Sequence, residues 1–438
     1  MTYEASIPLP DGFEFGVVKT DDELEELIKF NSSIHEPQGG VELRRIIELL
    51  PGFGRELNFF IRDTDKRLIV SSLNAIPSVW SYAGVPLRNL ELGFVGTLPD
   101  YRKRGLVRAL YREFFEKELV RGKYDISTIQ GIPYYYRQFG YDFLIPAWRS
   151  VFLRTKQVPE VPLEEKPSWK RLTIRRATKS NLDSIMQLYE EMTARTLVSS
   201  VRDRRLWQIQ EQQRHEDEKE FTTYIVKDGK NVEGYFRLVA RERAIQHSLS
   251  DPGDGFLDVI ESSIRTYDGV KCVLQFLKDK CEEMSLFRIA LSGAITSNLS
   301  QVGLDLGGNL SRGWKHQLRI PDMIRFLKRI SPVLQKRLQK TMFEGLTQEV
   351  TINTYRHCYV LGFQGGKIQQ ITDLGIHEHG KNLSFRAPPN DFVRLLLGQY
   401  SIEELNQQNT DFLVSGQVKS LIKALFPKQE SFIGYYHC

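Results

Sequence analysis

The first third of the chain switches repeatedly between strand-like and helix-like spacing of its hydrophobic residues. Thr20-Asp21-Asp22-Glu23 reads as a capping box, after which Leu24, Leu27 and Ile28 recur at helical spacing. A polar stretch at 31–40 is interpreted as a loop. In chain order the pattern predicts a strand at 13–19, a helix from 21, a second helix at 41–50 that Pro51-Gly52 ends, and strands at 58–62, 68–75, 90–95 and 124–129.

A basic glycine loop stands between a predicted strand and a predicted helix. Leu92, Phe94 and Val95 belong to the strand, which Pro99 ends. After Gly105, apolar residues recur at helical spacing, so one face of the following helix is apolar (Leu106, Val107, Leu110, Phe114, Phe115, Leu119). Unpaired N–H groups at a helix N-terminus bind anions, and a glycine lets the backbone approach one closely. The loop therefore predicts a phosphate or diphosphate site, with added charge from Arg102, Lys103, Arg104 and Arg108.

Two common nucleotide motifs are missing from this loop: neither G-x-x-x-x-G-K-S/T nor a G-x-G-x-x-G after the strand occurs. Instead, Arg102 to Val107 resembles the R-x-x-G-x-small loop of the GNAT superfamily of N-acetyltransferases. That resemblance implies that the loop amides hold the pyrophosphate of acetyl-CoA. Val107 stands where most members have Gly or Ala. The implied cofactor-binding set in this loop is Arg102, Lys103, Arg104, Gly105, Leu106, Val107 and Arg108.

A second motif runs from Gly131 to Tyr141, directly after the predicted strand at 124–129. It is similar to the Y-x-x-(F/L)-G-(F/Y) pattern of the same superfamily, in which the tyrosine lies beside the cofactor sulfur. The matching residue is Tyr136, whose phenol, with an ordinary pKa of about 10, suits a general acid that protonates a departing thiolate. Gly131 and Ile132 join the implied cofactor-binding set.

The rest of the chain predicts two further units. Val151 to Lys170, with three prolines, is interpreted as a linker. Residues 172–178 and 181–192 then repeat the strand–helix start of the first unit. Where a pyrophosphate loop belongs, Arg265 to Val270 has no basic cluster and contains Asp268, which repels phosphate. We therefore expect a degenerate second copy of the acetyltransferase fold.

The C-terminal part predicts alternating strands around 350–354 and 359–363 and helices at 392–397 and 415–426, and it resembles a sterol-carrier-protein-like domain. The fold class expected is α/β (α+β), with two acyl-CoA N-acyltransferase (GNAT) domains in tandem, at 1–156 and 168–318, followed by the sterol-carrier-like unit at 319–438. This plan is similar to that of the enhanced intracellular survival family. The resemblance implies acetylation of amines, notably aminoglycosides and lysine side chains, and a homo-oligomer, often a hexamer.

Two carboxylates compete for the role of general base. The family resemblance implies the C-terminal carboxylate, here carried by Cys438 where the family more typically ends in phenylalanine. Glu91, on the strand before the basic loop, is the second choice, by analogy with histone-acetylating relatives. In the expected direct transfer, a backbone N–H of Val95, Gly96 or Thr97 stabilises the thioester oxygen and Tyr136 protonates the thiolate. The alternative is that Glu91 has no catalytic role and is a strand residue that faces solvent or an arginine.

Composition narrows the class of protein. Sixty basic and 55 acidic residues give a net charge of +5, close to balance, which argues against a nucleic-acid partner. Four cysteines without a C-x-x-C pair predict neither a disulfide framework nor a zinc site, and a reducing cytoplasm fits. No apolar run is long enough for a membrane span, and Met1 to Phe15 lacks the apolar core of a signal peptide. No metal is expected, since His377 and His379 suit an exposed turn better than a metal site.

Three functions remain open from the sequence. The first is an acetyl-CoA-dependent acetyltransferase acting on small polycationic amines. The second is acetylation of protein lysines, which requires an open cleft. The third is a non-enzymatic scaffold that senses acyl-CoA and binds lipid or a partner, against which the intact Tyr136 argues.

Overall fold

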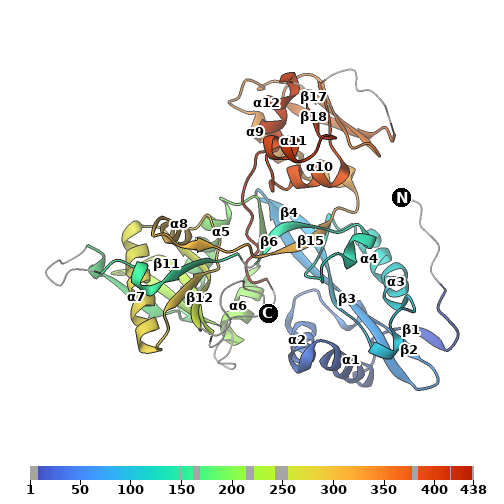
Figure 1. Ribbon diagram of the computed structural model, residues 1–438, viewed down its shortest axis with the longest axis horizontal. Helices are drawn as coiled ribbons and strands as arrows, with labels where there is room; N and C mark the ends of the chain where they lie inside the picture. Colours follow the sequence, from blue (N-terminus) through green and yellow to red (C-terminus); the bar gives the residue numbers. More distant parts are fainter. Residues whose placement is uncertain are drawn as a thin grey trace.

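The computed structural model describes residues 8–147, 149–160, 168–213, 221–241, 255–376, 383–414 and 416–436. Three sheets organise these residues, and each has helices packed against it (Figure 1). The C-terminal segment (residues 427–436) runs from the upper unit down between the other two, so all three units meet around it (Figure 1).

The first sheet has the order β1-β2-β3-β4-β5-β15-β6, and β9 pairs with β3 beside this path. Its strands are β1 (Phe13–Val17), β2 (Asn58–Asp63), β3 (Leu68–Tyr82), β4 (Val85–Thr97), β5 (Ile126–Ile129), β6 (Asp142–Ala147), β9 (Val198–Val201) and β15 (Trp314–Arg319). Its helices are α1 (Asp21–Ile34), α2 (Glu36–Leu49), and a continuous helical run made of α3 (Leu106–Leu110), a π-helical turn (Tyr111–Phe115) and α4 (Glu116–Arg121).

Local sequence signals explain the start of this unit. Thr20 caps α1 by accepting from the N–H of Glu23, whose carboxylate accepts from the N–H of Thr20. The predicted loop at 31–40 is wrong, because α1 continues to Ile34 and α2 begins at Glu36. Buried Asn31 donates its side-chain N–H to the Leu27 carbonyl one turn earlier in α1, so polarity there does not mark a loop.

The second sheet repeats the first in the order β14-β7-β13-β12-β11-β10-β8. Its strands are β7 (Val151–Arg154), β8 (Leu172–Arg176), β10 (Thr222–Asp228), β11 (Asn231–Arg241), β12 (Phe256–Ile264), β13 (Arg288–Leu291) and β14 (Asn309–Leu310). Its helices are α5 (Leu182–Thr193), α6 (Arg204–Gln213), α7 (Tyr267–Glu283) and α8 (Asn298–Asp305). In both sheets the two central strands, β4 with β5 and β12 with β13, run parallel.

Each of these two sheets contains a strand from outside its own expected limits. β7, in the stretch interpreted as a linker, pairs with β13 and β14 in the second sheet, so the linker prediction is wrong at 151–154. β15, expected within and at the end of the second unit, lies between β5 and β6 of the first sheet. The two sheets therefore exchange one strand each, at the same place in the strand order. The expected limits 1–156 and 168–318 do not follow the sheets at these two strands.

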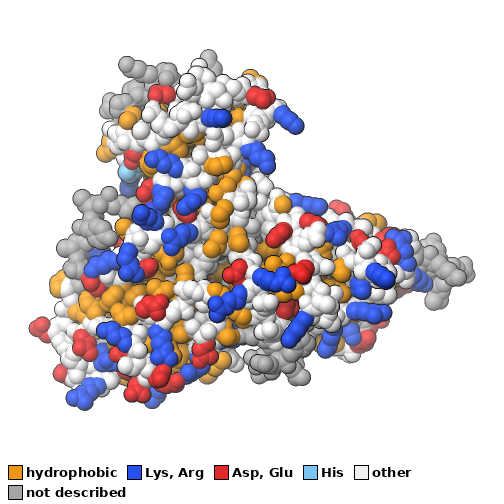
Figure 2. All heavy atoms as spheres, turned by 180° about the vertical axis from the view of Figure 1, so that it is seen from behind, with side chains coloured by type: hydrophobic (Ala, Val, Ile, Leu, Met, Phe, Trp, Pro, Cys, Tyr) orange, Lys and Arg blue, Asp and Glu red, His pale blue; other side chains and the backbone are white. Residues whose placement is uncertain are grey.

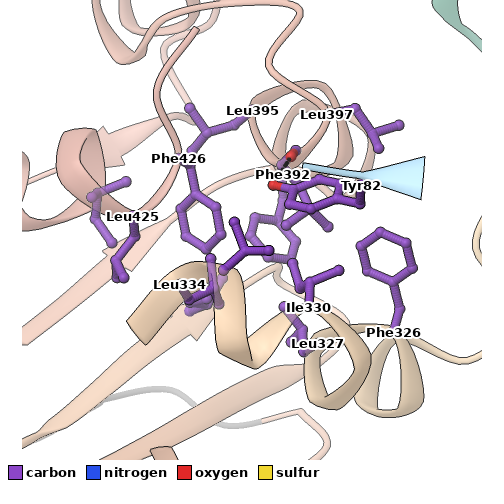
Figure 3. Packing of buried hydrophobic residues seen from close by; sticks show 14 of the residues in the cluster. Tyr82, Phe326, Leu327, Ile330, Leu334, Phe392, Leu395, Leu397, Leu425 and Phe426 are labelled. Atoms are coloured by element: carbon purple, nitrogen blue, oxygen red, sulfur yellow. Dashed lines mark hydrogen bonds between the residues drawn. The ribbon is translucent and has the colours of Figure 1, made fainter. Parts of the chain in front are cut away.

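The third sheet has the order β18-β17-β16-β19-β20. Its strands are β16 (Glu349–Asn353), β17 (Cys358–Gln364), β18 (Lys367–Asp373), β19 (Leu383–Arg386) and β20 (Leu413–Val414), and its helices are α9 (Met323–Leu338), α10 (Pro389–Leu396), α11 (Ile402–Gln408) and α12 (Gly416–Leu425). Tyr82, at the end of β3, inserts among the side chains of this unit beside Phe326 and Phe392 (Figure 3). The Tyr82 hydroxyl donates to the Leu396 carbonyl at 2.8 Å, so the first and third units share one core.

The surface is mixed in charge. Lys and Arg side chains alternate with Asp and Glu over the face shown in Figure 2, and hydrophobic side chains gather at the junction of the upper unit with the other two. In the part of the chain that the structure describes, no helix is both long and apolar enough to cross a bilayer.

Candidate active site

The central strands of the first sheet stop pairing at Glu91. The parallel ladder joins β4 to β5 only at Asn89–Ile126, Leu90–Ser127 and Glu91–Thr128, while β4 runs on to Thr97. The register of β4 against β3 shifts beside Phe94, whose φ of 44° is left-handed. Successive N–H groups of a strand point to opposite sides, so part of the Val95–Thr97 backbone faces away from β3, where a thioester carbonyl can accept a hydrogen bond.

The basic loop turns directly into the helical run that follows β4. Lys103 and Gly105 have φ values of 64° and 77°, and Gly105 is the residue before the first turn of α3. A Cβ at Gly105 would meet no atom within 4 Å, so the glycine serves the left-handed backbone rather than a close contact. The first-turn N–H groups of α3 have no partner within the helix, which is the local arrangement that an anion site requires.

The basic side chains around this loop differ in what they contact. Arg102 Nε reaches the Thr97 carbonyl at 3.4 Å, and Arg108 Nη2 donates to Gln138 Oε1 at 2.7 Å. The Arg104 guanidinium lies 5.1 Å from the Tyr101 ring centre. All of them, with Lys103, remain exposed at the surface. They fit an anionic group without being buried by it, whereas Leu106 is a core residue and Val107 is half-buried.

Tyr136 is fixed by close packing. It lies in a short 3-10 turn (Tyr135–Phe139) and is 6% exposed. A Cβ at Gly131 would lie 2.1 Å from Tyr136 Cε2, so the ring rests directly on the Gly131 backbone. Burial, reinforced by Tyr135 and Tyr141, raises the pKa of the Tyr136 phenol well above its usual range. The phenol is therefore protonated at neutral pH, the state that a general acid needs, while the neighbouring Ile132 is exposed.

β15 supports the loop beneath Tyr136. Gln317 Nε2 donates to the Gly131 carbonyl at 2.8 Å and reaches the Ile132 carbonyl at 3.4 Å. Arg319, two residues on, donates to Tyr111 and to both carboxylate oxygens of Glu116 at 2.7–2.9 Å. Sequence patterns did not identify Gln317 or Arg319 as site residues, because they lie far along the chain from the two motifs.

The C-terminal segment, defined here as residues 427–436, ends at Glu91. The Tyr436 hydroxyl donates to Glu91 Oε2 at 2.8 Å and accepts from Gln130 Nε2 at 3.2 Å. Glu91 is 5% exposed and Tyr436 is 7% exposed. Burial, together with the charge of Glu91, raises the pKa of the Tyr436 phenol. Tyr436 thus contacts Glu91, the last residue of β4 that pairs with β5, and Gln130, the residue before Gly131. These contacts place the C-terminal segment next to the second motif.

Two sequence-based candidates lie outside the described residues, namely Cys438 and the His377–His379 stretch. Among the residues that the structure does describe, no group of three His, Cys, Asp or Glu side chains is arranged to hold a metal ion. Tyr436 was not singled out from the sequence. The pair Tyr435-Tyr436, so close to the end of the chain, is the one local signal that could have indicated it.

The second sheet does not reproduce the site. At the start of α7, Thr266 caps the N–H of Gly269, and Asp268 accepts from Ser168 and pairs with Lys271. The one arginine there, Arg265, pairs with Glu191. These contacts occupy the position of a pyrophosphate loop with the chain's own groups, which supports the interpretation of a degenerate copy.

The central strands of the second sheet stay together beyond their ladder. Ser292 N–H donates to the Val259 carbonyl beyond the ladder of β12 and β13. A Cβ at Gly293 would lie 3.3 Å from the Ser262 nitrogen, so the segment after β13 stays packed against β12. The first sheet is therefore the one in which the strands part.

Comparisons with known proteins also single out the first unit. The acetyltransferase (GNAT) domain family matches residues 25–144, which contain both motifs. No curated protein sequence matches the chain significantly. Solved structures share the fold along the whole chain: a probable N-acyltransferase of Enterococcus faecalis V583 has 16% identity and a TM-score of 0.69, and the match covers 97% of this chain and 100% of that one.

Two more structures are similar over the same extent. A GCN5-related N-acetyltransferase of Anabaena variabilis has 15% identity and a TM-score of 0.68, with 96% and 99% of the two chains covered. Eis1 of Mycobacterium abscessus has 14% identity and a TM-score of 0.62, with 97% and 99% covered. The likeness of fold confirms the predicted α/β architecture, and the domain match confirms the general assignment as an acyltransferase. Membership of the enhanced intracellular survival family and the sterol-carrier-like third unit stay predictions.

Proposed function

We propose that the chain is an acetyl-CoA-dependent N-acetyltransferase whose active site lies in the first unit and whose acceptors are primary amines of small polycationic molecules such as aminoglycosides. The observation that carries this proposal is the left-handed backbone at Gly105, directly before α3, in a basic loop that follows β4. The domain match over the same residues supports it.

The residues present suit acetyl-CoA as co-substrate. The N–H groups of the loop from Arg102 to Val107 would take the pyrophosphate, and the exposed arginines would neutralise part of its charge. The irregular backbone around Phe94 would take the thioester carbonyl. Gly131, which lies against the Tyr136 ring, and the exposed Ile132 would complete the cofactor contacts.

The proposed chemistry is direct transfer. The neutral amine attacks the carbonyl carbon, a C–N bond forms, and the C–S bond breaks. A general base takes the proton from the amine, and the Tyr136 phenol gives its proton to the departing thiolate. Our order of preference for the base is the Cys438 carboxylate first and Glu91 second. The contact between Tyr436 and Glu91 supports both, since Tyr436 is two residues from Cys438 in the sequence and touches Glu91.

Acidic groups near the chain end favour a cationic acceptor. Glu91 contacts Tyr436 directly, and the charge of Glu42 also raises the pKa of Tyr436. Negative charge around Tyr436 attracts polyamines more than monoamines. Protein lysines remain an alternative acceptor class, and an acyl-CoA-sensing scaffold remains the non-enzymatic alternative.

The first test measures free-thiol release from acetyl-CoA against aminoglycosides, polyamines and a lysine peptide. The full chain is compared with Tyr136→Phe, with Glu91→Gln, and with a chain that lacks residues 437–438. We expect Tyr136→Phe to lower turnover about 100-fold, because it removes the general acid, with acetyl-CoA affinity nearly unchanged. An unaltered rate would remove Tyr136 from the acid role.

The two base variants separate the remaining possibilities. Loss of turnover in the shortened chain, with Glu91→Gln active, would support the terminal carboxylate. The reverse result would place the base at Glu91. Binding of acetyl-CoA without turnover on any amine would contradict the enzymatic proposal and favour a sensing role.

A further inference from the structure

A buried cluster of charged side chains lies in the second unit, next to the point where the ladder between its two central strands ends. Arg202 and Glu261 form a fully buried pair, with Arg202 Nη2 2.5 Å from Glu261 Oε2. Arg237 lies 3.0 Å from Glu211 and 3.7 Å from Glu261. Glu261 comes two residues after Val259, the last residue of β12 that pairs with β13.

Aromatic rings enclose the two arginines. The Arg202 guanidinium lies 3.9 Å from the Tyr189 ring centre and 4.1 Å from that of Trp207. Burial alone raises the pKa of the Glu261 carboxyl, but the two arginines outweigh it and lower that pKa. Glu261 is thus charged at neutral pH, and replacing such a buried ion pair by apolar groups of the same volume is often neutral or stabilising. Stability alone gives no reason for this cluster.

Gln210, on α6, connects the cluster to the C-terminal segment. Its Oε1 accepts from Arg202 Nη1 at 3.3 Å and from Arg237 Nη1 at 3.1 Å. Its Nε2 donates to the Tyr435 carbonyl at 2.9 Å. Because both arginines hold the amide oxygen, the amide nitrogen can point only toward the segment.

Gly434 lies directly against the same cluster. A Cβ there would be 2.7 Å from Glu261 Oε2 and 2.8 Å from Arg202 Nη2. Both atoms belong to the fully buried pair, so neither can move away cheaply. The backbone of the segment therefore follows a path that admits only glycine at this position.

Upstream, the segment is bound along β9. The N–H of Leu197 donates to the Glu430 carbonyl at 2.8 Å, and the N–H of Phe432 donates to the Val198 carbonyl at 2.9 Å. Downstream, Arg45 Nη2 donates to the Tyr435 hydroxyl at 3.0 Å. Tyr436 follows, on Glu91.

We propose that the Arg202–Arg237–Glu261 cluster and Gln210 are a clamp that positions the C-terminal segment, and that the second unit thereby sets Tyr436 against Glu91 in the active site of the first. This inference rests on the proposed function for its catalytic consequence. The clamp acts as a positioning device, since none of its groups touches the reacting atoms. Its physical effect is to remove the conformational freedom of a terminal segment.

The experiment uses the full chain with Gln210→Met, which keeps the side-chain length and removes the donor to Tyr435. The matched control is Gln187→Met, an exposed glutamine on α5 whose amide donates to Glu191. Gly434→Ala is a second, independent test of the segment's path. Substitution of Glu261 is avoided, because it leaves two buried arginines with one anion fewer.

Hydrogen–deuterium exchange of peptides that cover 427–436 and 196–201 is the direct readout. We expect exchange there to speed up at least tenfold in Gln210→Met and Gly434→Ala and to stay unchanged in Gln187→Met. In the thiol-release assay we expect kcat to fall about tenfold in both clamp variants, with the KM for acetyl-CoA unchanged. Unchanged exchange in both clamp variants would overturn the clamp.

The two proposals fail in different ways. If no amine supports turnover in the unaltered chain, the proposed function fails while the exchange data still test the clamp. If exchange speeds up but kcat is unaffected, the segment is held as described and its positioning role is overturned. If Gln210→Met does not fold, Gly434→Ala decides by the same two readouts.

Discussion

Tyr136 and Gly131 illustrate how single residues define this site. The phenol is buried and its pKa is raised, so it holds its proton at neutral pH, and its ring rests on a position without a side chain. Gly105 has a different reason to be glycine, because open space surrounds it and only its backbone angle is demanding. The sequence motif identified both glycines, but it did not distinguish a steric need from a conformational one.

Gly131→Ala tests the steric need. The new Cβ would overlap the Tyr136 ring, so we expect a loss of about 1–3 kcal/mol in the free energy of unfolding. We also expect at least a tenfold fall in turnover, since the ring must move. Denaturant unfolding and thiol release measure the two effects. Gly416→Ala is the control, because a Cβ there meets nothing within 4 Å, and equal behaviour of the two variants would contradict the argument.

Among the elements, β15 has the largest influence on the site. It enters the first sheet between β5 and β6, and its side chains hold the Gly131 carbonyl and the helical run at Glu116. β9 has a similar role on the other side, since it joins β3 to the C-terminal segment. A basic residue of α9 also joins distant parts of the chain. Arg325 donates to the Tyr124 carbonyl, so that helix face is docked on the first unit rather than only solvated.

Arg319→Met tests the contribution of β15. It leaves the half-buried Glu116 carboxylate without its two-pronged partner, so we expect a loss of about 2 kcal/mol in the free energy of unfolding. Arg121→Met removes an exposed arginine that pairs with Glu118 on the same helical run, and it should change the free energy of unfolding by about 0.5 kcal/mol or less. Denaturant unfolding compares the two, and similar losses would argue against a structural role for β15.

In the whole molecule the three units are fastened to one another. Strands are exchanged between the first two sheets, Tyr82 reaches into the third unit, and Arg394 of α10 pairs with Asp142 of β6 at 2.7 Å. The C-terminal segment then passes back between the first two units. We therefore expect one cooperative unfolding transition for these sheets rather than one for each predicted domain.

The buried Glu261 predicts how this stability depends on pH. Its pKa in the folded chain is below the unfolded value of 4.5, so its stabilising effect is present above that value and is lost as the pH falls through the folded pKa. We expect the free energy of unfolding to fall as the pH drops below about 4.5, with little dependence on salt because the pairs are buried. Urea unfolding across this range is the measurement, and a flat profile would contradict the prediction.

Local patterns in the sequence were sufficient for much of the first unit. The capping box at Thr20, the left-handed turn at Gly105 and the strand order around both motifs depend on neighbours in the chain, and periodicity encodes such contacts. The same reasoning failed at 31–40 and at 151–154. There, burial of a polar helix face and pairing with a distant strand outweighed local polarity and proline content.

Contacts between distant residues were not encoded in any local pattern. Gln317 and Gly131 are 186 residues apart, and Tyr436 and Glu91 are 345 apart. Such contacts depend on which strand enters which sheet and on where the chain end runs, and those choices are made by packing of the complete chain. The sequence alone thus indicated the acyltransferase class, through the motifs that contain Tyr136 and Gly105. The tertiary structure determined which distant side chains hold them, because only the folded chain brings β15, the arginine cluster and the C-terminal segment to the same place.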